Sequence, residues 1–132
     1  MSIHAKGTFE LKSFDEETYQ ELDGGTKLTR ARIVVAMSGD LAGEATTDHL
    51  MYYLPDGTAS FTGYQRFVGR IGDREGSFVQ MAVGGYDGTE ATTTTTVVTG
   101  SGTGDLRDVR GEGSFAVGRS GSGTYDLDYE LD

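Results

Sequence analysis

The stretch EATTDHLMYYLPDGTASFTGYQRFVG, residues 44–69, contains two β-strand patterns separated by a turn. The turn is Pro55–Thr58, because proline presets φ and the following glycine accepts positive φ. In the second strand, Ala59–Gly69, every second residue shares one face of the pleat. One face carries Phe61, Gly63, Gln65 and Phe67, and the other carries Thr62 and Arg66. The stretch therefore predicts an antiparallel hairpin with an apolar face.

Six further segments have the same strand pattern, and none of the connections between them has a ten-residue helical period. They are Gly7–Phe14, Lys27–Met37, Gly76–Gly85, Thr89–Val98, Gly111–Gly118 and Gly123–Asp132. The acidic segment Phe14–Gly25 is predicted to be a connection. Eight strands are enough to close a small barrel, which removes exposed sheet edges. We therefore predict one all-β domain over residues 1–132, a closed eight-stranded antiparallel β-barrel, with a two-sheet sandwich as the alternative.

Composition excludes several classes of protein. Of the 132 residues, 21 are glycine, one is proline and none is cysteine, so disulfides and thiolate chemistry are absent. The 21 acidic and 11 basic residues give a net charge of −10, which repels phosphates and anionic lipids. We therefore expect no nucleic-acid partner and no membrane partner. The N-terminal stretch MSIHAKGTF lacks a secretory signal, and with the absence of cysteine it favours a cytoplasmic location.

The glycine-rich stretch GSGTGDLRDVRGEGSF, residues 100–115, raises the question of a phosphate-binding loop. A dinucleotide fingerprint would need a third glycine where the chain has Asp105 or Arg107, and no Gly-Lys-Ser or Gly-Lys-Thr occurs. We therefore interpret the stretch as a connection between strands. The chain has two separate histidines, His4 and His49, which predict no metal site, and no cofactor is expected.

Polar residues within apolar strands suggest a small-molecule cavity inside the barrel. The ligand-binding candidates are Ile33, Met37, Phe61, Gly63, Phe67 and Phe78, with Gly63 expected to leave room for a ligand. Gln65 is the main polar candidate, followed by Tyr52, Glu44 and Glu112. The pattern leaves open which of Tyr52 and Tyr53 turns inward. The alternative for each of these polar residues, and for Tyr64 and Gln80, is a cross-strand neighbour or contact with water.

Several motifs together resemble one family, the small bacterial proteins of the domain-of-unknown-function 3224 family. The motifs are KLTRA (27–31), SGDLAGEAT (38–46), LMYYLPDGTASFTG (50–63), GSFV (76–79), GSGTGDL (100–106), RGEG (110–113) and YDLDYEL (125–131). The resemblance implies a barrel similar to allene oxide cyclase, within a group that includes oligomeric cyclases acting on unsaturated substrates in an apolar cavity. Gln65 stands where the resemblance implies glutamate, and Met81 and Ala82 stand where it implies histidine. These departures weaken an acid–base mechanism.

Two functions follow as hypotheses. The first is a cofactor-independent cyclase or isomerase that holds an apolar unsaturated metabolite in a reactive shape, with Gln65, Tyr52, Glu44 and Glu112 as catalytic candidates. The second is a non-catalytic carrier of an apolar metabolite. The feature that separates them is an ionisable group buried in the cavity. The resemblance also implies a homo-oligomer.

Overall fold

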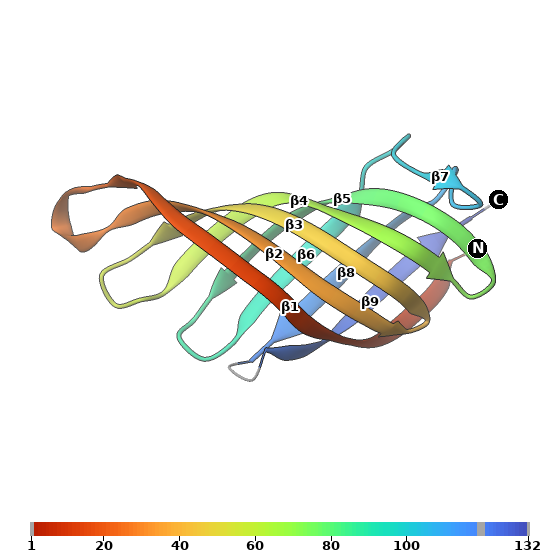
Figure 1. Cartoon of the computed structure of the whole chain (residues 1–132), viewed down its shortest axis with the longest axis horizontal. Coiled ribbons are helices and arrows are strands. Elements are labelled where there is room, and N and C mark those ends of the chain that lie inside the picture. Colours follow the sequence, from red (N-terminus) through yellow and green to blue (C-terminus); the bar gives the residue numbers. More distant parts are fainter. Residues whose placement is uncertain (1, 119–120, 132) are drawn as a thin grey trace.

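Alternating side chains and glycine turns fold this chain into a closed ring of eight antiparallel strands, as predicted (Figure 1). The computed structural model describes residues 2–118 and 121–131. The ring order is β4-β3-β2-β1-β9-β8-β6-β5, and β5 pairs with β4 to close it. The ring strands are β1 (Ile3–Glu21), β2 (Lys27–Gly39), β3 (Leu41–Tyr53), β4 (Ala59–Ile71), β5 (Arg74–Tyr86), β6 (Ala91–Val97), β8 (Arg110–Val117) and β9 (Ser122–Glu130).

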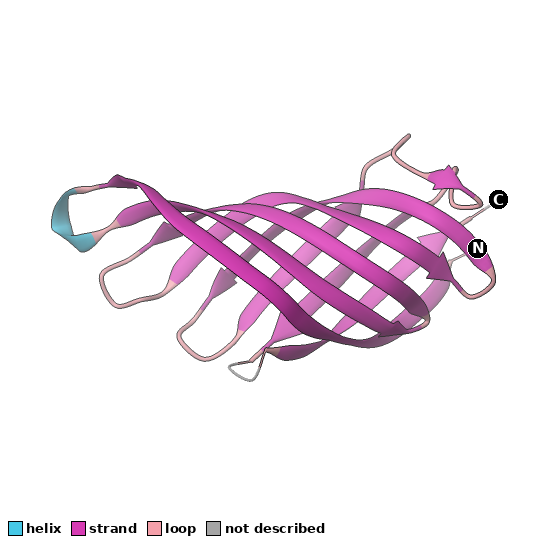
Figure 2. Cartoon of the chain, viewed as in Figure 1, coloured by secondary structure: helices cyan, strands magenta, loops and turns pink. Residues whose placement is uncertain are grey.

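Two short elements lie outside this ring (Figure 2). β7 (Thr103–Gly104) pairs with β5, and η1 (Asp23–Gly25) is a 3-10 turn between β1 and β2. The closed ring rules out the two-sheet sandwich. Among the described residues, no helix is long and apolar enough to span a bilayer.

Strand β1 is much longer than the sequence pattern predicts. The expected connection Phe14–Gly25 continues as strand to Glu21, paired with β2 along its whole length. Register shifts between Leu11 and Ser13 and between Thr18 and Gln20 interrupt the alternation of inward and outward side chains. The sequence therefore lacks the period-two pattern that would predict a strand here. On its other edge β1 pairs with β9 only as far as Glu10. The remainder of β1 and its partner β2 form an overhang at one end of the barrel (Figure 1).

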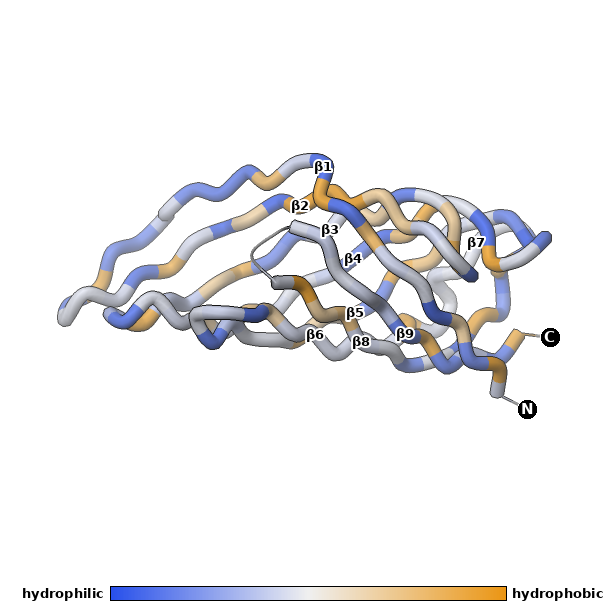
Figure 3. Tube along the Cα trace, turned by 90° about the horizontal axis from the view of Figure 1, so that it is seen from below, coloured by the Kyte–Doolittle hydropathy of each residue, from blue (hydrophilic) through white to orange (hydrophobic). Residues whose placement is uncertain are grey.

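The end of the barrel opposite the overhang is filled by a dense apolar core. Phe67 and Phe78 are fully buried there, with ring centroids 5.3 Å apart. Leu106 and Val109, from the connection between β7 and β8, are 0% and 2% exposed and pack into the same core. Residues 105–109 of the glycine-rich stretch therefore connect β7 to β8 and cap the closed end, whereas residues 103–104 and 110–115 belong to these two strands. Along the strands, hydrophobic and hydrophilic residues alternate (Figure 3).

Tyr125 of β9 connects four strands at this closed end. Its hydroxyl accepts a hydrogen bond from Leu41 N–H at 2.8 Å and lies 2.8 Å from the carbonyl oxygen of Ser38, to which it can donate. The ring passes over Gly7 of β1, where a Cβ would lie 2.5 Å from the Tyr125 hydroxyl oxygen. Gly39, at φ 105°, turns the chain beside it. Glycine is required at both positions because neighbouring backbone, the Ser38 carbonyl at Gly7 and Gly7 itself at Gly39, leaves no space for a Cβ, and the Tyr125 hydroxyl lies close to both.

Candidate functional site

A cavity of about 320 Å³ lies inside the barrel at the end away from the cap. It reaches the rim formed by the β3–β4 and β5–β6 turns, because Tyr53, Tyr86 and Ala91 are the last or first residues of their strands. The wall is mostly aromatic and aliphatic. It is formed by Phe9, Phe14, Ile33, Val35, Thr47, His49, Met51, Tyr53, Phe61, Gln65, Tyr86, Ala91, Thr93, Phe115 and Val117. None of these described lining residues carries a formal charge near neutral pH.

Both tyrosine hydroxyls at the rim already have partners. Tyr53 donates to the Glu16 carboxylate at 2.7 Å, and Tyr86 donates to the carbonyl oxygen of Gly88 at 2.8 Å. The Glu16 carboxylate also accepts from the Thr29 hydroxyl at 2.6 Å. Burial, followed by the hydrogen bond to Glu16, raises the pKa of Tyr53 well above its ordinary value. The two rings therefore serve as apolar wall, with their polar ends directed to protein atoms.

Deeper in the barrel, His49 and Gln65 place polar atoms within the apolar wall. They are 6% and 4% exposed, and neither His49 Nε2 nor Gln65 Nε2 has a hydrogen-bond partner among the described residues. The imidazole stacks on Phe61 with centroids 4.5 Å apart. Burial lowers the pKa of His49 to about 4, so the ring is neutral at physiological pH. It offers hydrogen bonding without charge.

The strand register explains why these groups come together. One row across the inner face contains His49, Gly63, Ala82 and Thr95, and the adjacent row contains Thr47, Gln65, Gln80 and Val97. Gln80 and Thr95 are each 2% exposed, and Gln80 Oε1 and Thr95 Oγ1 also have no partner among the described residues, but neither residue lines the cavity. We call the two residues that do line it, His49 and Gln65, the polar floor.

The structure divides the predicted ligand-binding residues into two groups. Ile33 and Phe61 lie on the cavity wall, together with Gln65. Met37, Phe67 and Phe78 also face inward but pack in the closed-end core and do not line the cavity. Their expected position on the cavity wall is therefore wrong, because the filled end of the barrel contains them.

Gly63 does not provide the expected room. A Cβ at this position would collide with the backbone carbonyl of Asp48 on β3. The glycine allows β3 and β4 to approach closely, so a side chain there would displace a strand and would not project into the cavity. The expectation that Gly63 leaves room for a ligand is therefore wrong.

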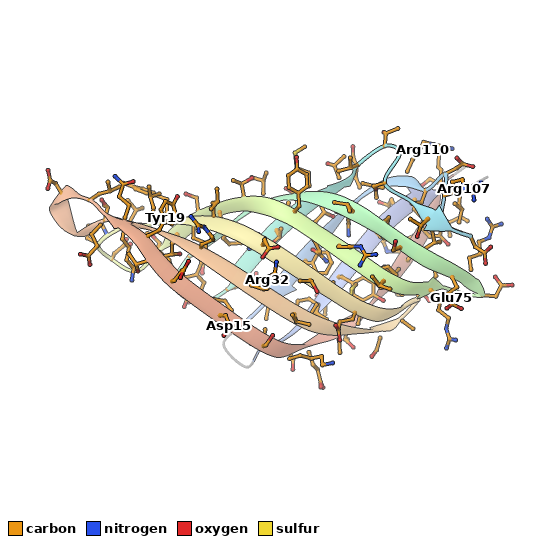
Figure 4. All side chains as sticks on the ribbon, turned by 45° about the horizontal axis from the view of Figure 1, so that its top comes forward. Asp15, Tyr19, Arg32, Glu75, Arg107 and Arg110 are labelled. Atoms are coloured by element: carbon orange, nitrogen blue, oxygen red, sulfur yellow. The ribbon has the colours of Figure 1, made fainter. Side chains whose placement is uncertain are left out.

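Three of the four polar candidates lie outside the cavity. Tyr52 has the outward phase of β3, and its neighbour Tyr53 lines the cavity. Glu44 is exposed and pairs with Lys12 at 2.8 Å, and Glu112 is exposed on β8. Their expected placement in the cavity is wrong, because each occupies the outward phase of its strand. The outer surface is polar here: Arg32 projects from β2 and bonds Asp48 at 2.8 and 2.9 Å (Figure 4).

His49 is the main cavity residue that sequence reasoning missed. The signal was present in the phase of β3, since the charged residues Glu44 and Asp48 share the face opposite to Ala45, His49 and Met51. A charged face marks the outside, so the other face must point inward.

Comparisons with known proteins support the fold. A family model described as "Protein of unknown function (DUF3224)" matches residues 5–129. A crystal structure at 1.84 Å resolution of a protein with unknown function from this family, from Shewanella oneidensis MR-1, has a TM-score of 0.84 and 24% sequence identity. The alignment covers 100% of this chain and 99% of that chain. No curated protein matches the chain.

Proposed function

The chain belongs to the DUF3224 family, and we propose that its barrel binds an apolar small molecule in the open cavity. One observation carries the proposal: hydrogen-bonding atoms of His49 and Gln65 are buried in an apolar wall without a protein partner. Buried polar groups nearly always have partners, and an unpaired one costs about 1–3 kcal/mol. A ligand polar group would remove that cost.

The shape and chemistry of the cavity support the same function. Small-molecule sites are concave, mostly apolar and contain a few polar groups that orient the ligand. A volume of about 320 Å³ falls at the small end of the range for such sites. The aromatic wall would contribute hydrophobic energy, and the two polar groups would fix orientation.

A titration with an apolar fluorescent probe tests this function. Thr93 lines the cavity, whereas its neighbour Thr92 is exposed on the outer face. We expect Thr93→Phe to fill the cavity and weaken probe binding, and Thr92→Phe to bind as the parent does. Equal binding by all three proteins, or no saturable binding by the parent, would refute the proposal. Native mass spectrometry of freshly purified protein would show a retained ligand and the assembly state.

A cyclase or isomerase activity is a second proposal, favoured by the neutral imidazole of His49 beside the Gln65 amide. Such a pair can hydrogen-bond a carbonyl or epoxide oxygen while the wall restricts the shape of a flexible substrate. The test is to incubate a retained ligand with the parent and with His49→Phe, and to separate isomers of equal mass by chromatography. Conversion by the parent alone supports catalysis, and no conversion by either favours a carrier. A cytoplasmic location and a homo-oligomeric state remain predictions.

A further inference from the structure

Among the described lining residues, the fully buried hydrogen-bonding atoms without a partner belong to the polar floor. At the rim, the hydroxyls of Tyr53 and Tyr86 already donate to Glu16 and Gly88. Deeper in the barrel, the Nε2 atoms of His49 and Gln65 have no partner among the described residues, and both residues are nine-tenths or more buried. A ligand would therefore place its polar group deep in the barrel and its apolar body against the aromatic rim.

The polar floor can both donate and accept hydrogen bonds. The Gln65 Nε2 amide donates, and His49 Nε2 donates or accepts according to its tautomer. A ligand hydroxyl also does both, so it can accept from Gln65 and donate to the unprotonated Nε2 of His49.

Charge is disfavoured at the same place. Apart from His49, whose imidazole is neutral at physiological pH, the described lining residues include no acidic or basic side chain, and the Glu16 carboxylate already accepts hydrogen bonds from Tyr53 and Thr29. A buried carboxylate or ammonium without a counter-charge is strongly destabilised. The site therefore lacks what it would need to hold an ionised ligand.

We propose that the ligand is an uncharged, largely apolar molecule whose hydroxyl group hydrogen-bonds to the polar floor through Gln65 and His49. This inference rests on the proposed binding function. It adds the chemical class of the ligand and the direction in which the ligand enters. It separates neutral alcohols and phenols from fatty-acid-like carboxylates.

Three probes with the same ring system test the class by isothermal titration calorimetry at pH 7: naphthalene, 2-naphthol and 2-naphthoate. We expect 2-naphthoate to bind at least about 10-fold more weakly than 2-naphthol, because its ionised group would be buried without a counter-charge. The ratio of 2-naphthol to naphthalene affinity should fall about 2- to 10-fold in Gln65→Leu, which corresponds to one hydrogen bond. Because the same ratio is measured for the parent and for Gln65→Leu, the difference in hydration between naphthalene and 2-naphthol cancels.

A matched control is Gln20→Leu, the same chemical change on the exposed extension of β1. This variant should keep the parent ratio. If 2-naphthoate binds as tightly as 2-naphthol, or if Gln65→Leu leaves the ratio unchanged, the ligand class is wrong while naphthalene binding still supports the function. If none of the three probes binds the parent, both proposals are overturned. The 2-naphthol and 2-naphthoate comparison needs only the parent, so it holds even if Gln65→Leu fails to fold.

Discussion

Removing the hydroxyl oxygen of Tyr125 should measurably destabilise the folded barrel. In Tyr125→Phe the ring remains, and the buried amide of Leu41, a residue 1% exposed, loses its acceptor at 2.8 Å. An unpaired buried donor costs about 1–3 kcal/mol. The Ser38 carbonyl is on an exposed residue and can bond water in its place, so it adds little. We expect the free energy of unfolding to fall by about 1–3 kcal/mol.

Urea unfolding followed by circular dichroism measures this change. An unaltered slope of the free energy of unfolding against urea concentration would show that parent and variant expose the same surface on unfolding. The corresponding drop in Tm is about 3–5 °C per kcal/mol for a domain of this size. Tyr64→Phe is the matched control, because Tyr64 is 58% exposed and its change should stay within about 0.5 kcal/mol. If Tyr125→Phe unfolds at the same urea concentration as the parent, the hydroxyl does not stabilise the closed end.

Three further changes test other parts of the structure. His49 is neutral in the folded state, with a pKa of about 4 against an ordinary 6.5, so the unfolded chain gains a proton first as pH falls. The contribution of the neutral imidazole to the free energy of unfolding is complete above pH 6.5 and should decline by about 3 kcal/mol towards pH 4. The difference in free energy of unfolding between the parent and His49→Phe, measured in urea, should therefore change with pH across this window. A constant difference would contradict the burial of a neutral imidazole. Leu106→Ala should cost about 2–5 kcal/mol, measured by calorimetry or urea, because it leaves a hole in the cap, and no loss would mean that the cap is not part of the core. Gly63→Ala should cost about 1–3 kcal/mol by overpacking against β3, and a variant as stable as the parent in urea would show that the two strands are not in close approach.

The fold was predictable because its determinants are local. Alternation within each strand and the turn at Pro55–Thr58 are read directly from the sequence, and in the structure Tyr53 pairs with Ala59 across that turn. It is harder to predict which face of a strand points inward when both faces are apolar. In the run LMYYL every residue is apolar or aromatic, so alternation alone cannot assign Tyr52 and Tyr53 to a face. The register with β4, which places Met51 opposite Phe61, resolves it.

Two other features depend on contacts that no local pattern encodes. The bulges in β1 interrupt the alternation of inward and outward side chains, so the sequence of this acidic strand has the pattern of a connection. The cap residues Leu106 and Val109 lie among glycines and charges without any period. Their burial follows from the position of the connection across the end of the barrel, which only the complete fold determines.

The pairing of the first strand with the last has a consequence for the order of folding. Seven of the eight neighbouring pairs in the ring join ring strands that follow one another along the chain. The eighth pair joins β1 to β9, which are separated by almost the entire chain. During synthesis the strands from β1 to β8 can form a growing sheet, but closure has to await residues 122–130. Such non-local contacts carry a loop-closure entropy cost that slows folding. Until closure, the edge of β1 offers unpaired backbone groups to any neighbouring chain, and a second copy with its own β9 is the best-matched partner for exchange.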